Sequence, residues 1–157
     1  MSSTPPQAKS KKLGSSYPTI DQKLCFALYS SSLAMLQSYK PLLAAIDLTY
    51  PQYLVMLVLW EGDGISIKHL SERLGQDPGS VTPLVKRLEE AGFVTRRRDA
   101  QDERNLSIEL TATGRALQQK AEQASGKFVT ACQLPQKEGG DLRDRLFALT
   151  QTLREPG

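Results

Sequence analysis

The 157-residue sequence is poor in the residues that most metal centres and hydrolytic sites need. It has a single histidine, His69, and only two cysteines, Cys25 and Cys132. This leaves no His/Cys cluster for a metal, and it removes the simplest Ser-His-Asp and Cys-His arrangements. Two cysteines cannot form a disulfide framework, which favours a reducing, intracellular setting. We therefore predict no metal, no cofactor and no enzymatic activity, with His69 on the surface.

Aromatic residues and net charge are also low. Aromatics make up 6% of the chain, which argues against a protein that binds single strands by stacking bases. The 20 basic and 17 acidic side chains leave a net charge of +3. Any nucleic-acid surface must therefore come from where the charges lie, since the chain as a whole is only slightly basic.

Long hydrophobic runs are absent. The longest, from Tyr53 to Trp60, has eight residues, far fewer than the roughly 20 that span a bilayer. Residues 1–18 combine Ser, Pro and Lys without an apolar stretch, which predicts a disordered tail and no secretory signal. We expect a soluble, cytoplasmic protein that does not bind a membrane.

Two helices are predicted in the first third of the chain. Thr19 and Gln22 match a capping box, so a helix should begin there and reach about residue 45, with Pro41 kinking or ending it. Thr49 precedes a second helix that is apolar on every side from Tyr53 to Trp60. This second helix should be buried all round.

The centre of the chain has the pattern of a helix-turn-helix. A short helix over residues 65–74 is followed by Gly75 and Gln76 as a turn. Asp77 and Pro78 then begin a helix that should run to Ala91, with Gly92 just beyond its end. Two short helices joined by a glycine-containing turn are typical of this motif.

The next segment changes to strand periodicity. Residues 93–98 and 106–110 read as two strands joined by a polar turn. A helix-turn-helix followed by such a hairpin is a winged helix. Thr111 should cap a helix that reaches towards Cys132, followed by a loop over 133–140 and a last helix over 141–154, with Leu142, Leu146 and Leu149 pointing inward. The predicted fold class is mostly α with a small β-hairpin.

Several polar residues of this winged helix are placed to contact double-stranded DNA. The second helix of the motif enters the major groove with its first residues at base edges. Its hydroxyls can donate to or accept from several bases, its basic residues suit phosphates, and an arginine at the hairpin tip suits the minor groove. The candidate residues are Ser80, Thr82, Lys86, Arg87, Arg96, Arg98, Asp102 and Arg104. Nearby acidic residues, such as Glu89 and Asp99, leave open a merely solvated surface.

Four stretches of the sequence resemble those of a known protein family. The sequence Asp102-Glu-Arg104 before Leu106-Ser-Ile-Glu-Leu-Thr resembles the wing of MarR family repressors, in which the arginine reads the minor groove and the aspartate orients it. The stretches at 24–29, 39–43 and 48–53 resemble the organic-hydroperoxide-responsive (OhrR-type) branch. The resemblance implies a homodimer on pseudo-palindromic operator DNA. It also implies one domain over 19–157, with dimerisation helices at 19–48 and 112–157 and the DNA-binding part at 49–111.

Cys25 is the candidate redox sensor. It falls in the second turn of the predicted first helix, with Tyr29 on the same face. Tyr39 is also on that face but about 21 Å further along, so it can reach only the Cys25 of a partner helix packed antiparallel. The resemblance implies that Tyr39 and Tyr50 reach across a dimer to the peroxidatic cysteine. From the residues alone, a buried structural cysteine and ordinary interface tyrosines stay open.

Cys132 is the candidate resolving cysteine, because some members of this branch carry a second cysteine in that region. We favour a Cys25–Cys132 bond between subunits over an inert Cys132 or the use of a small external thiol. The predicted function is a repressor that releases its operator when an organic hydroperoxide oxidises Cys25. The alternatives are a MarR-type repressor released by a small aromatic or phenolic ligand, with Cys25 structural, and, less favoured, a thiol peroxidase.

Overall fold

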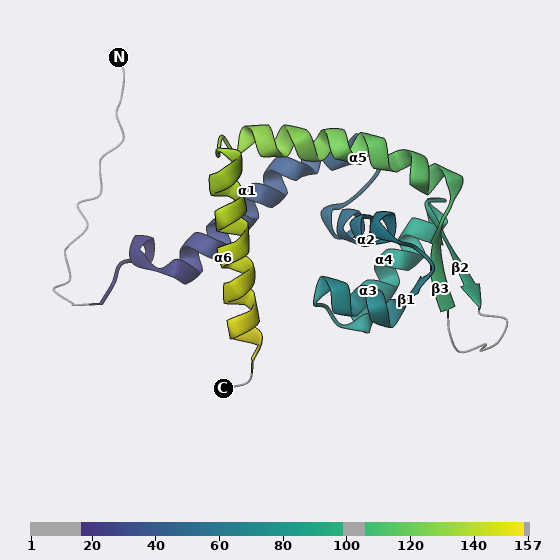
Figure 1. Ribbon diagram of the computed structural model, residues 1–157, viewed down its shortest axis with the longest axis horizontal. Coiled ribbons are helices and arrows are strands. Elements are labelled where there is room, and N and C mark those ends of the chain that lie inside the picture. The colour runs from purple at the N-terminus through teal and green to yellow at the C-terminus, as the bar shows by residue number, and fades with distance from the viewer. Residues whose placement is uncertain (1–16, 99–105, 156–157) are drawn as a thin grey trace, which may run out of the picture. The chain divides into compact units, whose positions relative to one another are not determined.

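The computed structural model describes residues 17–98 and 106–155. In these ranges the chain is mostly helical, with one small sheet, as the sequence predicts (Figure 1). The elements are η1 (Ile20–Gln22), α1 (Leu24–Ala44), α2 (Tyr50–Glu61), β1 (Ile65–Ser66), α3 (Ile67–Leu74), α4 (Pro78–Glu90), β2 (Val94–Arg98), β3 (Leu106–Leu110), α5 (Ala112–Ala131) and α6 (Gln136–Arg154). The chain forms two compact units, Met1–Ala34 and Met35–Gly157.

The first helix begins later than its capping box predicts. The backbone N–H of Thr19 donates to Gln22 Oε1 at 3.0 Å, but the box begins only the single 3-10 turn η1. Lys23 is extended, and α1 begins at Leu24. Cys25 is therefore in the first turn of α1, and the predicted second turn is wrong. Pro41 does not end the helix, which continues to Ala44.

The second helix begins where the sequence predicts. Thr49 Oγ1 accepts from the N–H of Gln52, and the Gln52 side chain accepts from the N–H of Thr49. Most of the apolar run is buried, but Leu57 is 38% exposed. The prediction of burial on every side is therefore wrong at Leu57, and Leu54 and Trp60 are only half-buried.

The helix-turn-helix is confirmed with one addition. Ile65, predicted to be helical, lies in β1, and α3 begins two residues later with Ser66 as its cap. Gly75 ends α3 with a φ of 62°, a left-handed conformation that glycine adopts without a Cβ penalty. Asp77 caps α4, and Gly92, with a φ of 81°, follows its end as predicted.

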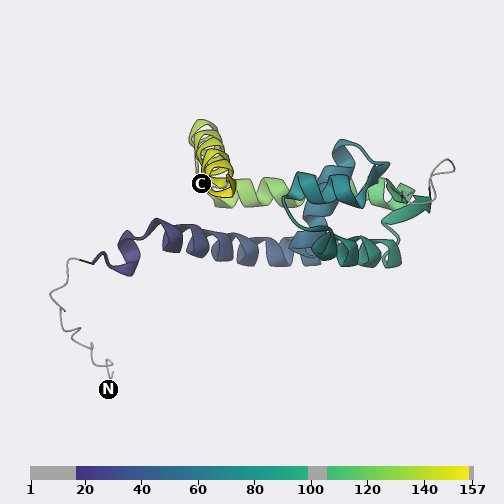
Figure 2. The same cartoon turned by 90° about the horizontal axis from the view of Figure 1, so that it is seen from below.

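The wing is part of a three-stranded sheet of order β1-β3-β2. The two-stranded prediction missed β1, because two residues are too few to show an alternating pattern. Both pairings are antiparallel, with Ile65 opposite Ile108 and Val94 opposite Leu110. β2 and β3 lie beside the N-terminal end of α5 in both views (Figures 1 and 2). The turn between them lies outside the described residues.

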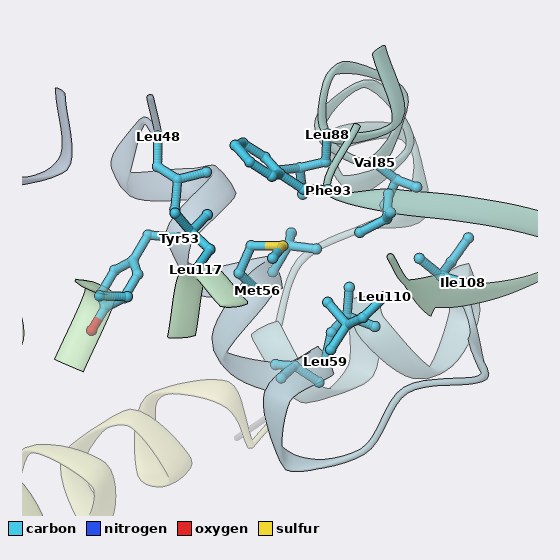
Figure 3. Close-up of a cluster of buried hydrophobic side chains, with 14 of the residues drawn as sticks. Leu48, Tyr53, Met56, Leu59, Val85, Leu88, Phe93, Ile108, Leu110 and Leu117 are labelled. Carbon is cyan, nitrogen blue, oxygen red and sulfur yellow. The ribbon is translucent and has the colours of Figure 1, made fainter. Parts of the chain in front are cut away.

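The core of the second unit joins the helix-turn-helix to the sheet. Figure 3 shows side chains from α2, α4, the sheet and the start of α5 pointing toward one another. The apolar side chains of the core with an exposed fraction of 1% or less are Leu43, Val55, Met56, Leu59, Leu70, Val81, Val85, Leu88, Val94, Ile108 and Ala121. Burying this apolar surface on one side of α4 leaves its opposite side to solvent.

The last helix begins earlier than predicted. After α5, residues 133–135 form the connection, and α6 begins at Gln136, where the sequence predicted a loop to Gly140. Leu142 and Leu146 are exposed and Leu149 is half-buried, so their inward placement is wrong for the single chain. In the described ranges, no helix is long and apolar enough to cross a membrane.

Candidate functional site

The exposed side of α4 carries the predicted base-reading residues, and its first turn fixes their hydroxyls. Asp77 Oδ2 accepts from Ser80 Oγ at 2.7 Å, and Asp77 Oδ1 accepts from the Ser80 N–H at 3.1 Å. These donors, the hydroxyl first, hold the pKa of Asp77 below its usual value. Thr82 Oγ1 donates to the carbonyl of Pro78 at 2.8 Å. Both hydroxyl protons are thus used within the helix, which leaves their oxygens as acceptors for base amino groups.

The basic residues of this surface fall into two groups. Lys86 and Arg87 are exposed on α4. Arg96, on β2, instead contacts Glu89 of α4 through its Nε at 2.8 Å, its Nη2 at 2.7 Å and its backbone N–H at 3.1 Å. The Arg96 side chain lowers the pKa of Glu89. Arg96 therefore holds the wing sheet against α4, and this contact competes with a phosphate contact.

The wing itself is described only in part. Arg98 is exposed at the end of β2, opposite Leu106 in β3. Its neighbour Arg97 pairs with Glu109 at 3.2 Å. Asp102 and Arg104 lie outside the described residues. The described part places α4 and the strands of the wing in one unit, as a winged helix requires.

Cys25 lies in the first unit, in the first turn of α1, as a free and exposed thiol. Tyr29, four residues along the same helix, is 63% exposed. Several apolar neighbours on this segment are exposed as well: Ile20, Leu24, Phe26 and Leu33. The segment thus combines an accessible thiol with an apolar surface that nothing in its own unit covers.

Tyr39 and Tyr50 lie together in the second unit, with ring centroids 5.3 Å apart. Tyr39 is buried and stacks on Phe128 of α5 at 4.4 Å, with Tyr53 at 5.7 Å. Burial raises the pKa of Tyr39 to about 12, and a side-chain hydrogen bond with Ser125 acts in the opposite direction. The pKa of Tyr50 is raised too, first by burial and then by Tyr53.

One hydroxyl of this tyrosine cluster has a sulfur partner. Tyr50 Oη donates to Met35 Sδ at 3.7 Å. Sequence reasoning missed Met35, Tyr53 and Phe128 as members of the cluster. Tyr53 could have been predicted from the sequence, since it lies three positions after Tyr50 on one helix face. Phe128 was not, because 89 positions separate it from Tyr39.

Cys132 ends α5 as its C-cap residue and is a free, exposed thiol. It lines a surface cavity of about 510 Å³ at the α5–α6 connection, together with Val129, Leu134, Pro135, Gln136 and Gly139. His69 is exposed on α3, as predicted. Among the residues that the structure describes, no three His, Cys, Asp or Glu side chains are grouped to hold a metal ion.

Comparison with known proteins gives one family profile and several relatives. The profile described as "Transcriptional regulator SarA/Rot" matches residues 37–121. The chain is 39% identical over 136 residues to the organic hydroperoxide resistance transcriptional regulator of Bacillus subtilis, which covers 87% of this chain and 92% of that protein.

The fold is also similar to solved structures of AbfR from Staphylococcus epidermidis. A structure of reduced AbfR bound to DNA has 34% identity and a TM-score of 0.74, covering 86% of this chain and 92% of that one. A structure of disulfide-formed AbfR has 32% identity and a TM-score of 0.62, covering 86% and 90%.

Proposed function

This chain belongs to the MarR family of winged-helix transcriptional regulators, and we propose that it is a repressor released from DNA by organic hydroperoxide. In this proposal the reduced protein binds operator DNA as a homodimer, and oxidation of Cys25 ends that binding. The observation that carries the proposal is a free, exposed Cys25 in the first turn of α1 of a chain 39% identical to an organic hydroperoxide resistance regulator.

DNA binding is supported by the exposed side of α4. Its first two turns offer the Ser80 and Thr82 oxygens to base edges, and Lys86 and Arg87 follow one turn later for phosphates. The relative AbfR has been solved bound to DNA in its reduced form. The wing supplies further basic side chains, with Arg98 exposed at the end of β2.

Sensing requires that Cys25 reacts as a thiolate with the peroxide. The sulfur attacks one peroxide oxygen, an S–O bond forms as the O–O bond breaks, and the alkoxide leaves as an alcohol after taking a proton. The resulting sulfenic acid condenses with a second thiol, forming a disulfide and releasing water. Cys132 is our candidate for that thiol, and AbfR has been solved in a disulfide form.

The homodimer is supported by apolar surface at both ends of the chain. Leu24, Phe26 and Leu33 of α1 are exposed in the single chain, as are Leu146 and Phe147 of α6. Exposed apolar side chains grouped on a helix are what a second subunit would cover. In the dimer, Tyr39 and Tyr50 are our candidates for hydrogen bonds to the partner's sensor cysteine.

Cys25→Ser tests the proposal. Serine keeps the shape of the side chain but cannot be oxidised, so the variant should bind a duplex selected by the wild-type protein as tightly as wild type does. Organic hydroperoxide should release wild type and leave Cys25→Ser bound, in an electrophoretic mobility assay. Cys132→Ser, which keeps the sensor thiol, is the matched control for the loss of a cysteine.

A small-ligand repressor is the second candidate. A cavity of about 240 Å³ between α2 and α5 has Tyr53 and Trp60 in its wall, which suits a small aromatic molecule. Release of Cys25→Ser from DNA by hydroperoxide would contradict the redox proposal. Release by a phenolic compound, with no response of wild type to hydroperoxide, would support this second candidate.

A further inference from the structure

One carboxylate connects three elements at the base of the wing. Asp63 lies in the loop between α2 and β1, and its Oδ2 accepts from the Leu110 N–H at 2.8 Å and from Arg115 Nη2 at 2.7 Å. Next to it, the Gly64 N–H donates to the carbonyl of Ile108 at 2.7 Å. The loop is thus bonded to β3 at Ile108 and at Leu110. Through Arg115 it is also bonded to the first turn of α5.

The attachment lies where β3 passes directly into α5. β3 ends at Leu110 and α5 begins at Ala112, so Thr111 alone separates them. Figures 1 and 2 show the strands beside this end of α5. A one-residue connection has only two backbone dihedrals to fix the angle between strand and helix. Thr111 is itself held towards β2, because its N–H donates to the carbonyl of Phe93 at 3.1 Å and its hydroxyl donates to the carbonyl of Gly92 at 2.6 Å. The contacts of Asp63 add a second attachment, from α5 to β3.

The two contacts of Asp63 have different roles. The bond to Leu110 satisfies a backbone N–H near the end of the strand, and the Asp63 side chain is only 22% exposed. The Arg115 side chain is 60% exposed, and an ion pair this open to solvent adds little to global stability. Its two ends are nevertheless on different elements, so it opposes a change in the angle between them.

We propose that Asp63 and Arg115 are positioning residues for DNA binding, which hold the wing at a fixed angle to α5. Neither residue needs to touch DNA. The pair keeps the wing aligned with α4 for simultaneous contact with the two grooves. It also couples any tilt of α5 directly to β3, whereas the bonds of Thr111 couple α5 to the residues before β2. The inference rests on the proposed DNA binding and is independent of Cys25 oxidation.

The test uses two substitutions that break the pair and keep the strand bond. Asp63→Asn retains an oxygen for the Leu110 N–H, and Arg115→Gln leaves Asp63 untouched. Each should weaken binding of the reduced full chain to a duplex selected by wild type from a randomised pool, by about threefold to tenfold. The double variant should lose no more than either single one, since the two residues act as one unit. Arg115→Lys, which keeps a charge, should recover part of the loss.

Two measurements separate positioning from other causes. The dependence of affinity on salt should keep its wild-type slope in Arg115→Gln, because no phosphate contact is removed, whereas Lys86→Ala should lower the slope by about one. The thermal midpoint of Arg115→Gln should stay near wild type. The matched control is Arg143→Gln, which breaks an exposed pair with Asp144 at 2.8 Å on α6 and should not change affinity.

Unchanged affinity in both single variants would overturn the inference and leave DNA binding intact. A salt slope lowered by one in Arg115→Gln would overturn it too, because Arg115 would then be a phosphate contact. Additive losses in the double variant would do the same. If the pool yields no duplex that wild type binds, the proposed function itself fails and the inference fails with it.

Discussion

Arg96 illustrates how a single residue is read differently once its neighbours are known. Its place on the predicted hairpin made it a candidate DNA contact, but its guanidinium and its backbone N–H both bond Glu89. The seven positions between them span the end of α4 and the turn into β2, so no helical or strand spacing pairs them. The positive charge of Arg96 was visible in the sequence, whereas its ion pair with Glu89 depends on the fold.

Tyr39 gives a prediction from burial. Its pKa is raised from 10.0 to about 12, so in this window the unfolded chain releases the phenol proton while the folded chain keeps it. The folded state binds more protons there, and its stability must fall as the pH rises from 10 towards 12. Tyr39→Phe removes this titration, so its denaturant midpoint should fall less steeply over that window.

Tyr50→Phe should flatten the same curve, since burial raises the pKa of Tyr50 as well. Other groups that ionise in this range are present in all three proteins and cancel in the comparison. Parallel curves for wild type and Tyr39→Phe would contradict the burial of the Tyr39 hydroxyl in the folded protein.

At the scale of elements, the same capping motif gave two different outcomes. The boxes at Thr19 and Thr49 are both formed, but one begins a three-residue 3-10 turn and the other the twelve-residue α2. A capping box satisfies only the first N–H groups of a helix, and continuation depends on packing. Five residues of α2 are buried, whereas η1 has none. The capping motif therefore located a helical turn in both places, but only packing decided whether an α-helix continued from it.

α5 contains a matched pair of glycines that test its packing on the wing. A Cβ on Gly114 would overlap the carbonyl oxygen of Phe93, while a Cβ on Gly126 would meet nothing within 4 Å. Gly114→Ala should therefore lower the free energy of unfolding by about 1–3 kcal/mol, the usual cost of overpacking. Gly126→Ala should raise it by about 0.5–1 kcal/mol through helix propensity.

Urea unfolding of the two variants measures this difference. The sign should reverse between two identical substitutions in one helix. A Gly114→Ala protein as stable as wild type would mean that the first turn of α5 does not contact the Phe93 carbonyl, just before β2, as closely as described. It would also weaken the case for a fixed angle at Thr111.

At the scale of the whole molecule, the sequence could not say what covers its apolar faces. The spacing of Leu142 and Leu146 in α6 correctly indicated one apolar side, yet both are exposed in the single chain. A helical pattern shows that a face avoids water, but it does not distinguish cover by the same chain from cover by a second copy. The winged helix was predictable because its own chain fills its core. The sensor arrangement was not, because it is proposed to need two chains.

The disulfide prediction belongs to this scale, because it concerns two copies of the chain. Cys25 and Cys132 are both free and exposed, and Cys132 lies beside an open cavity at the end of α5. If Cys132 of one subunit resolves the sulfenic acid on Cys25 of the other, hydroperoxide should convert wild type to a covalent dimer on a non-reducing gel. Cys132→Ser should stay at the monomer position, as should Cys25→Ser.

The two single variants should nevertheless differ in their chemistry. Cys132→Ser still forms the sulfenic acid, and without a protein thiol to intercept it the sulfur should proceed more readily to sulfinic acid or form a mixed disulfide with an added small thiol. Cys25→Ser should show neither product by intact-mass spectrometry. If wild type oxidises completely and gives no dimer band, the bond between subunits is refuted. The sulfenic acid must then be resolved by an external thiol or by a disulfide within one chain. The intact mass distinguishes these two products, because only the mixed disulfide adds the mass of the thiol.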